Sequence, residues 1–514
     1  MIVGELSQNE LQSYLDIQNR DRCEAIGRIH QNIRSLCLTS KRVESIARPL
    51  LFRTITVSSP KQLLLLYSAL LEKTQLGFYI REISLEILPK SINPKDFLPL
   101  PSGALTLLTT PWESPGRELD TEDHEYPAYY CDQILSLALY SILRRAPDTQ
   151  KLVLRIQQVS FRYPEDREKD LTFAYEPFFR RVQFARARAE FLPRLKTLQL
   201  LGDPELPGKM VIYDICAPLF QSSTLENIAV SQVLGLLDDS GCEVSSASDK
   251  ALGTIKTAEL RDCLCGDREL RGFGSVFPNL ESFKLSLMMD DFCNSSDANG
   301  ARGENRFEDL EGSLRKMKSL HTLNLEFSHT FKAIDMSKLP AEGLSLASLV
   351  NLAILRIPLM ILAGGDDTTS WSIGSRLARN LPRYLKHLTV SIEVSSLTHW
   401  YGDGATDVSS ATSTQISTIL GFIEALSSLG TEVFPHLKEV VCCYTMKGYR
   451  RRQEIEIAEA TSTDLEEADL FGLDEDSSQR LEKLRRSVRR SQIRFSVAYE
   501  ELYGNIESRD GGWA

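Results

Sequence analysis

A short phrase recurs along this chain and restricts its folding more than any other feature. It consists of an apolar residue, Pro, any residue and Leu, then two polar residues, then two apolar residues separated by one position. Copies with Pro stand at 192–200, 277–285 and 434–440, one with an inserted residue at 381–390, and copies without Pro at 225–230, 255–260, 320–325 and 352–357. A phrase repeated in this way predicts a repetitive fold.

Each copy of the phrase has the pattern of a junction between a helix and a strand. Leu198 and Leu200 are two positions apart, so they project from the same face of a strand. Pro193 cannot continue a helix and disfavours helical geometry in the residue before it. The phrase therefore predicts an incoming helix, a turn and a half-buried strand.

The segments ahead of these strands have helical spacing. Leu310, Leu314 and Met317 have this spacing ahead of Leu320, where the copy at 320–325 begins, and Ile416, Ile419, Ile423 and Leu426 have it ahead of the copy at 434–440. Successive strands begin 25 to 52 residues apart, with an average near 35. Units of this size bury their apolar faces only by stacking. We therefore predict an α/β solenoid, with parallel strands on its concave side and helices on its convex side.

The array has further predicted members at both ends. Strands are expected at 80–87 and 152–156 with a helix at 129–145 between them, so the array should begin near residue 78. A helix carrying Leu481, Leu484 and Val488 and a strand carrying Ile493, Phe495 and Val497 should close it, as terminal repeats do. Insertions rich in polar and turn residues interrupt the period at 110–128, 290–306 and 402–415.

Composition and charge argue against several classes of function. Lys and Arg number 59 and Asp and Glu 70, a net charge of −11, so neither nucleic acid nor an anionic membrane is an expected partner. The apolar run at 63–71 is about half the length of about 20 residues that a membrane span needs. Without a signal-like N-terminus, we expect an intracellular protein of the cytoplasm or nucleus.

Catalytic and metal-binding motifs are missing from the sequence. It contains no G-x-S-x-G, no phosphate-binding G-x-x-x-x-G-K, no H-E-x-x-H, and no C-x-x-C among its ten cysteines. A calcium-loop-like stretch at 295–306 has Ser295 and Arg306 where the first and twelfth ligands are needed. We therefore predict a protein that is not an enzyme and uses no metal or cofactor, with buried free thiols.

The N-terminal residues have their own pattern, which divides the chain into a helical unit at 1–57 and the repeat array with its cap at 58–514. Pro49 is expected to end the last helix. The simplest interpretation of this unit is a cap that shields the first repeat. Its expected core is Leu11, Leu15, Ile26, Ile29, Ile33, Leu36, Leu38, Val43 and Ile46.

Residues 33–53 are similar to the second half of a fungal F-box. That half has an apolar helix, a Ser-Lys-Arg turn, here at 40–42, a short helix, and a Pro-Leu-Leu-Phe-Arg exit, here at 49–53, into a first strand at 54–57. The opening at 6–11 differs, because it lacks the family's Pro and has one extra residue, and Val43 stands where the family has Trp or Phe. The uneven leucine phrases resemble the degenerate repeats of fungal F-box/leucine-rich-repeat proteins.

This resemblance implies a function. The chain would be a substrate-recognition subunit of an SCF-type ubiquitin ligase, whose N-terminal helices bind a Skp-type linker while the repeat array binds a target protein. The alternative is a leucine-rich-repeat scaffold or interaction protein whose helices are only a cap. The linker-binding residues that the resemblance implies are Leu6, Leu11, Leu36, Leu38, Val43, Ile46 and Pro49.

Overall fold

The chain divides into two compact units, Met1–Val233 and Leu234–Ala514. The structure is a computed structural model. It describes residues 31, 32, 35, 40–87, 127–156, 158–160, 171–173, 178, 179, 181, 182, 191–202, 219, 222–231, 253–263, 273–287, 306–327, 343–363, 376–393, 421–430, 432–446, 454–456, 486 and 493–501.

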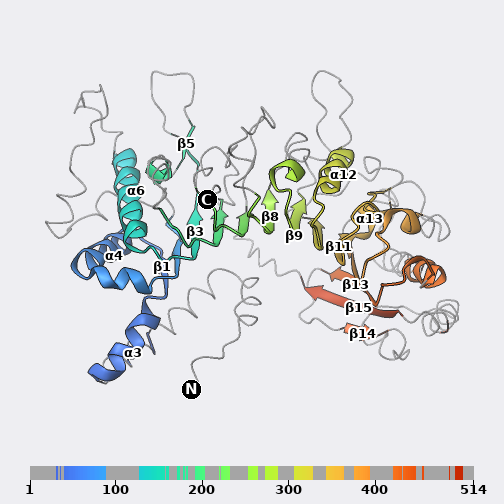
Figure 1. The fold of residues 1–514 in the computed structure, drawn as a ribbon, viewed down its shortest axis with the longest axis horizontal. Coiled ribbons are helices and arrows are strands. Elements are labelled where there is room, and N and C mark those ends of the chain that lie inside the picture. The colour runs from blue at the N-terminus through green and yellow to red at the C-terminus, as the bar shows by residue number, and fades with distance from the viewer. Residues whose placement is uncertain are drawn as a thin grey trace, which may run out of the picture. The chain divides into compact units, whose positions relative to one another are not determined.

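The first unit contains a parallel sheet whose strands follow the order of the sequence. These strands are β1 (Thr54–Val57), β2 (Glu82–Leu85), β3 (Lys151–Arg155), β6 (Thr197–Leu201) and β7 (Asn227–Ser231). A separate antiparallel pair consists of β4 (Gln158–Ser160) and β5 (Leu171–Phe173). The helices are α3 (Lys41–Leu51), α4 (Pro60–Glu72), the 3-10 helix η1 (Thr74–Tyr79) and α6 (Pro127–Arg145). Helices α4 and α6 pack side by side (Figure 1).

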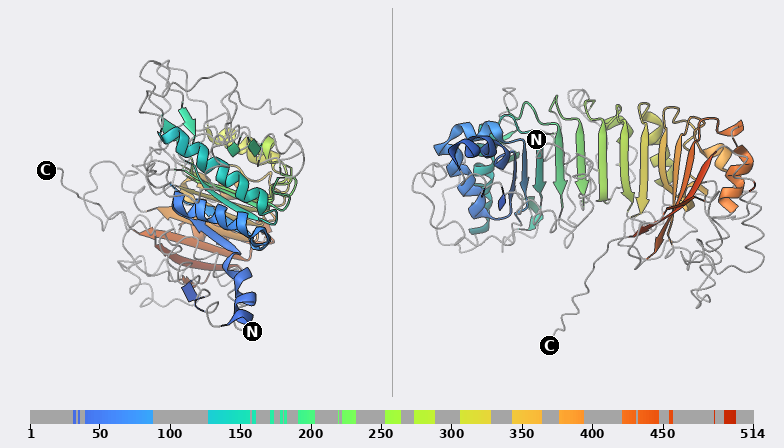
Figure 2. Two further views of the ribbon diagram at one scale, coloured as in Figure 1. Left: turned by 90° about the vertical axis from the view of Figure 1, so that its left-hand side faces the viewer. Right: turned by 90° about the horizontal axis from the view of Figure 1, so that it is seen from below.

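The second unit repeats this arrangement with more strands. In order they are β8 (Thr257–Cys263), β9 (Ser282–Leu287), β10 (Thr322–Phe327), β11 (Ile354–Pro358), β12 (His387–Glu393), β13 (Glu439–Met446) and β15 (Arg494–Glu501), and all these neighbours are parallel. Strand β14 (Glu454–Glu456) adds to β15 in the antiparallel sense. Helices α12 (Arg306–Lys316) and α13 (Leu359–Ala363) lie beside these strands (Figures 1 and 2).

The core lies between the helices and one face of each sheet. Leu323 and Leu325 of β10 are completely buried, whereas the alternate residues Asn324 and Glu326 are half-buried on the other face. Helix α12 contributes Leu310, which is also completely buried. The alternating pattern read from the sequence therefore marks the buried face, and the predicted α/β architecture, a solenoid-like arrangement of parallel repeats, is confirmed.

One backbone contact recurs where each strand begins. The carbonyl of the residue before a strand accepts two hydrogen bonds from consecutive amides of the next repeat: Lys256 O accepts from Glu281 N at 2.8 Å and Ser282 N at 3.0 Å. Because this contact fixes where the next strand starts, it holds the parallel strands in register. Equivalent carbonyls belong to Arg53, Arg81, Gln150, Lys196, Glu281, His321, Ala353 and Lys386.

Two predictions about the N-terminal region are corrected. The array begins at β1 rather than near residue 78, because β1 pairs in parallel with β2 from Thr54↔Glu82 to Val57↔Leu85. Pro49 does not end its helix but lies inside α3, which continues to Leu51. A proline in the last turn removes only one helical hydrogen bond, and the amide of Phe52 still closes the helix on Arg48 O.

Other predicted elements have mixed outcomes. The helix predicted at 129–145 is α6, and the last predicted strand is β15. The short strands β4, β5 and β14 were not predicted. The predicted insertions at 110–128, 290–306 and 402–415 lie outside the described residues, apart from the first residues of α6 and α12. Leu481, Leu484 and Val488 of the last predicted helix lie outside them as well.

Candidate recognition surface

Charged side chains gather on the half-buried face of β8, β9, β10 and β11, opposite the core. The register places Glu259 beside Lys284, Lys284 beside Asn324, and Asn324 beside Arg356. Because the strands are parallel and in register, side chains on the same face form a row across the sheet. We call Glu259, Arg261, Lys284, Asn324, Glu326 and Arg356 the strand-face cluster.

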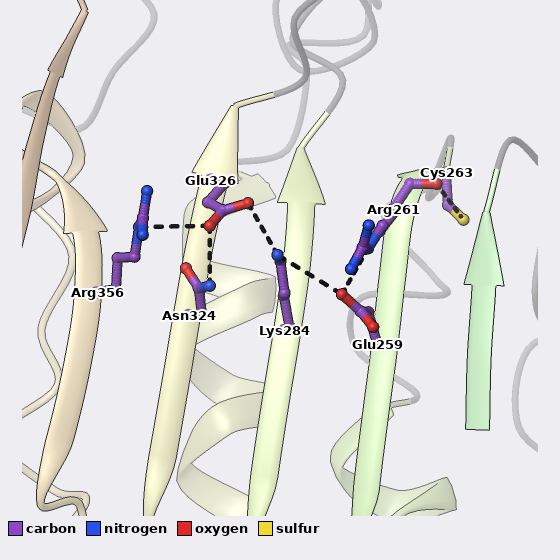
Figure 3. Close-up of polar contacts among 7 residues, drawn as sticks. All are labelled: Glu259, Arg261, Cys263, Lys284, Asn324, Glu326 and Arg356. Atoms are coloured by element: carbon purple, nitrogen blue, oxygen red, sulfur yellow. Dashed lines mark hydrogen bonds and ion pairs between the residues drawn. The ribbon is translucent and has the colours of Figure 1, made fainter. Parts of the chain in front are cut away.

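Ion pairs connect this cluster across all four strands (Figure 3). The Nζ atom of Lys284 lies 3.6 Å from Glu259 Oε1 and 3.3 Å from Glu326 Oε2, so one ammonium group bridges two carboxylates. On the far side of Glu326, Arg356 Nε lies 3.3 Å from Oε1. Asn324 Nδ2 donates to the same oxygen at 2.9 Å.

Arg261 joins the cluster from the same strand as Glu259, two positions further on, so the alternation of the strand places both side chains on one face. The pairing of β8 with β9 shifts register between Leu260 and Cys263, which is the signature of a β-bulge. Arg261 Nε donates to Glu259 Oε1 of its own strand at 2.6 Å, as Figure 3 shows.

The cluster is partly shielded from water but remains open to a partner. Its charged side chains are 24% to 38% exposed, with Glu326 the least exposed and Arg261 the most. Three cations and two carboxylates give a net charge of +1, opposite in sign to that of the chain. Partly desolvated charges interact more strongly than fully exposed ones. The cluster can therefore offer directed hydrogen bonds to polar or acidic groups of a second molecule.

The titration of Glu326 reflects these neighbours. Burial alone would raise the pKa of this carboxyl, but the positive charges of Lys284 and Arg356 and the hydrogen bonds from Asn324 and Lys284 outweigh burial. The pKa of Glu326 is consequently lower than the usual glutamate value. The charged form is thus the one that the fold stabilises.

The described thiols do not resemble nucleophiles. Cys263, Cys442 and Cys443 are buried. Burial raises the pKa of Cys442, and the neighbouring Cys443 adds to this effect, so its thiol stays protonated. Within the parts of the chain that the structure describes, no three His, Cys, Asp or Glu side chains are grouped closely enough to hold a metal ion.

The residues implied by the F-box resemblance fall into two groups. Val43, Ile46 and Pro49 all belong to α3, where Val43 and Pro49 are half-buried and Ile46 is 66% exposed. The others, Leu6, Leu11, Leu36 and Leu38, lie outside the described residues.

Helix α3 presents a second apolar residue that was not among the predicted site residues. Leu50 is 39% exposed and follows Ile46 by four positions, so the two side chains share one face of the helix. The helix begins where Ser40 Oγ accepts from Val43 N at 3.2 Å, and an ion pair between Glu44 and Arg48 supports it. Within α3 itself only Ala47 is buried.

The strand-face cluster was missed in the sequence, although a signal for it was present. The middle position of the apolar-x-apolar strand pattern is charged or amide-bearing in four consecutive strands, as Glu259, Lys284, Asn324 and Arg356. Alternation alone marks such positions only as solvent-facing. Their opposite charges become informative once the strands are known to be neighbours in register.

The structure defines a class, a parallel α/β repeat protein, and comparison with known proteins takes the assignment no further. No family model matches the sequence, and no curated protein matches it. Among the helices that the structure describes, none is long and apolar enough to cross a membrane.

The lowered pKa of Glu326 leads to a prediction about stability and pH. Because the folded-state pKa lies below the unfolded value of about 4.3, the carboxylate stabilises the fold fully above that value and loses its effect as pH falls through the folded pKa. Glu326→Gln should cost about 1 kcal/mol in urea unfolding at pH 7, with a smaller difference from wild type in acid. Glu281→Gln, at an exposed ion pair, is the control. A cost for Glu326→Gln that does not change with pH would contradict this prediction.

Proposed function

We propose that this chain is a non-enzymatic substrate-recognition subunit of an SCF-type ubiquitin ligase. In this proposal the N-terminal helices bind a Skp-type linker, and the repeats, taken as leucine-rich repeats with concave strands, bind a target protein. The observation that carries the proposal is the exposed apolar face of α3, directly ahead of the first strand of the array.

The exposure of α3 distinguishes the proposal from the alternative. A helix that served only as a cap would bury its apolar side chains on the first repeat. Ile46 is instead 66% exposed and Leu50 39% exposed. Exposed apolar side chains spaced by one helical turn are suited to a groove in another protein. This favours linker binding over the scaffold interpretation.

The order of elements after α3 also supports the proposal. The F-box resemblance implies a short helix, a Pro-Leu-Leu-Phe-Arg exit and then a strand. Here α3 contains Pro49, Leu50 and Leu51, its C-cap is Phe52, and β1 begins at Thr54. Because β1 is already part of the sheet, a linker bound at α3 would be joined to the repeats through only two residues, Phe52 and Arg53.

Target binding is assigned to the strand face for a chemical reason. The strand-face cluster holds Arg261 and Arg356, and arginine is enriched among the residues that dominate binding energy at protein interfaces. Its ion pairs hold the side chains in place before a partner arrives, which reduces the entropy lost on binding. Binding by positioned side chains needs no catalytic group.

Linker binding can be tested with single substitutions on two exposed helices. Ile46→Glu should weaken binding of the full chain to a purified Skp-type linker by about tenfold or more in isothermal titration calorimetry, because a charge would enter an apolar contact. Leu65→Glu is the matched control, since Leu65 is 55% exposed on α4. If the wild-type chain does not bind the linker at micromolar concentration, the scaffold alternative replaces this proposal.

Target binding can be tested by affinity capture of the tagged chain from its own cell extract. Arg356→Ala should reduce the capture of the target about tenfold while the amount of co-purified linker stays constant, because the two surfaces are distinct. Lys256→Ala, at an exposed ion pair outside the cluster, should change neither. Quantitative mass spectrometry supplies the measurement. If wild type and Arg356→Ala capture the same amount of target, the strand-face cluster is not the target-binding site.

A further inference from the structure

A second charged surface lies where β12 and β13 begin, away from the strand-face cluster. Arg383, Lys386 and Lys438 are exposed there, in the turns that lead into these two strands. The amide of Lys438 donates to the carbonyl of Lys386 at 2.9 Å, so the two lysines stand on adjacent strands about 4.8 Å apart. The backbones of two exposed lysines are thereby adjacent.

An aromatic pair accompanies these cations. The rings of Tyr384 and His436 stack with their centroids 5.4 Å apart and their planes 20° from parallel. Tyr384 is 56% exposed and His436 is exposed as well. In each repeat a single buried leucine, Leu385 or Leu437, separates the ring from the lysine. The repeat therefore places an aromatic pair next to a cation pair.

The local charge is opposite to that of the chain. The described stretches 376–393 and 432–439 hold five Lys and Arg residues and three Glu residues, a net charge of +2, whereas the whole chain carries −11. The carboxylate of Glu439, the residue after Lys438, lies 3.2 Å from His387 Nδ1 and 3.6 Å from Arg494 Nη1, so it is already engaged by two neighbouring side chains. A concentrated positive field on an acidic protein attracts negative groups to that place.

Together these features form what we call the basic edge: Arg383, Tyr384, Lys386, His436 and Lys438. We propose that the basic edge binds an acidic peptide segment of a partner protein, with carboxylates at the lysines and an apolar side chain against the aromatic pair. This surface shares no residue with the strand-face cluster or with α3, so the proposal does not depend on the ubiquitin-ligase function. A short acidic segment fits better than nucleic acid, because a net charge of −11 repels a long polyanion.

The test measures fluorescence polarisation of the full chain with a fluorescein-labelled peptide of alternating Glu and Leu. Wild type should bind this peptide, and the affinity should fall as salt is raised. Lys386→Glu combined with Lys438→Glu should weaken binding about tenfold or more, and Tyr384→Ala should weaken it as well. Lys318→Glu, at an exposed turn ahead of β10, should leave the affinity unchanged.

Two further probes show which property of the peptide the basic edge recognises. A peptide of alternating Gln and Leu tests whether charge is needed, and a single-stranded oligonucleotide tests whether phosphate is preferred. The proposal is overturned if the Glu-Leu peptide does not bind, or if the Gln-Leu peptide binds as tightly as the Glu-Leu peptide. It is also overturned if the oligonucleotide binds more tightly than the Glu-Leu peptide, or if Lys318→Glu weakens peptide binding as much as the double variant does. Because both lysines are exposed, the double variant should fold as wild type does, and circular dichroism checks this directly.

Discussion

The paired hydrogen bonds at the start of each strand are the constraint on which the other features depend. One carbonyl oxygen accepts hydrogen bonds from two consecutive amides of the next repeat. The same contact recurs in both units, from the carbonyl of Arg53 to that of Lys386. A parallel strand displaced by one residue would lose this contact and turn its leucines away from the helices. By fixing the register, the contact therefore also fixes which side chains lie next to one another on the half-buried face of the strands, opposite the core.

Register has direct electrostatic consequences on that face. It places Lys284 between Glu259 and Glu326, and Glu326 between Lys284 and Arg356, so each of these two central charges has a partner on both sides. The same register places Lys386 beside Lys438 at the basic edge, where like charges are adjacent. Opposite charges in a row stabilise the sheet, whereas like charges in a row destabilise it slightly and favour an anionic partner. The row of opposite charges on β8 to β11 therefore stabilises the sheet, whereas the two adjacent lysines at the basic edge favour binding of an anionic group.

Much of the fold could be predicted because burial imposes a simple pattern. Alternating leucines in β10 and the helical spacing of Leu310 and Leu314 are properties of single elements, so the sequence displays them. The position of Pro49 inside α3 could not be predicted, because a proline both ends helices and is tolerated in a solvated last turn. The short strands β4, β5 and β14 have three residues each, too few for a clear period.

The candidate sites were predicted less well than the fold. The helical pattern placed Ile46 in the core of the N-terminal unit, but this residue is exposed on α3, and no local pattern shows that Leu50 is exposed too. The strand-face cluster joins residues from 259 to 356, which are far apart in the sequence and meet only because their strands are neighbours. Such sites depend on which strands are neighbours and in what register, which is information about tertiary structure rather than about any single segment.

Disulfide trapping of the register tests the central claim most directly. Thr322 and Ile354 are register partners on β10 and β11, and Ile354 is 41% exposed, so cysteines at both positions should form a disulfide on mild oxidation. Cysteines at Ser282 and Ile354 are two strands apart, about 9.6 Å, and should not form one. Peptide mapping by mass spectrometry distinguishes the two outcomes. Efficient cross-linking of the second pair, or none of the first, would contradict the stacked parallel repeats and the surfaces derived from them.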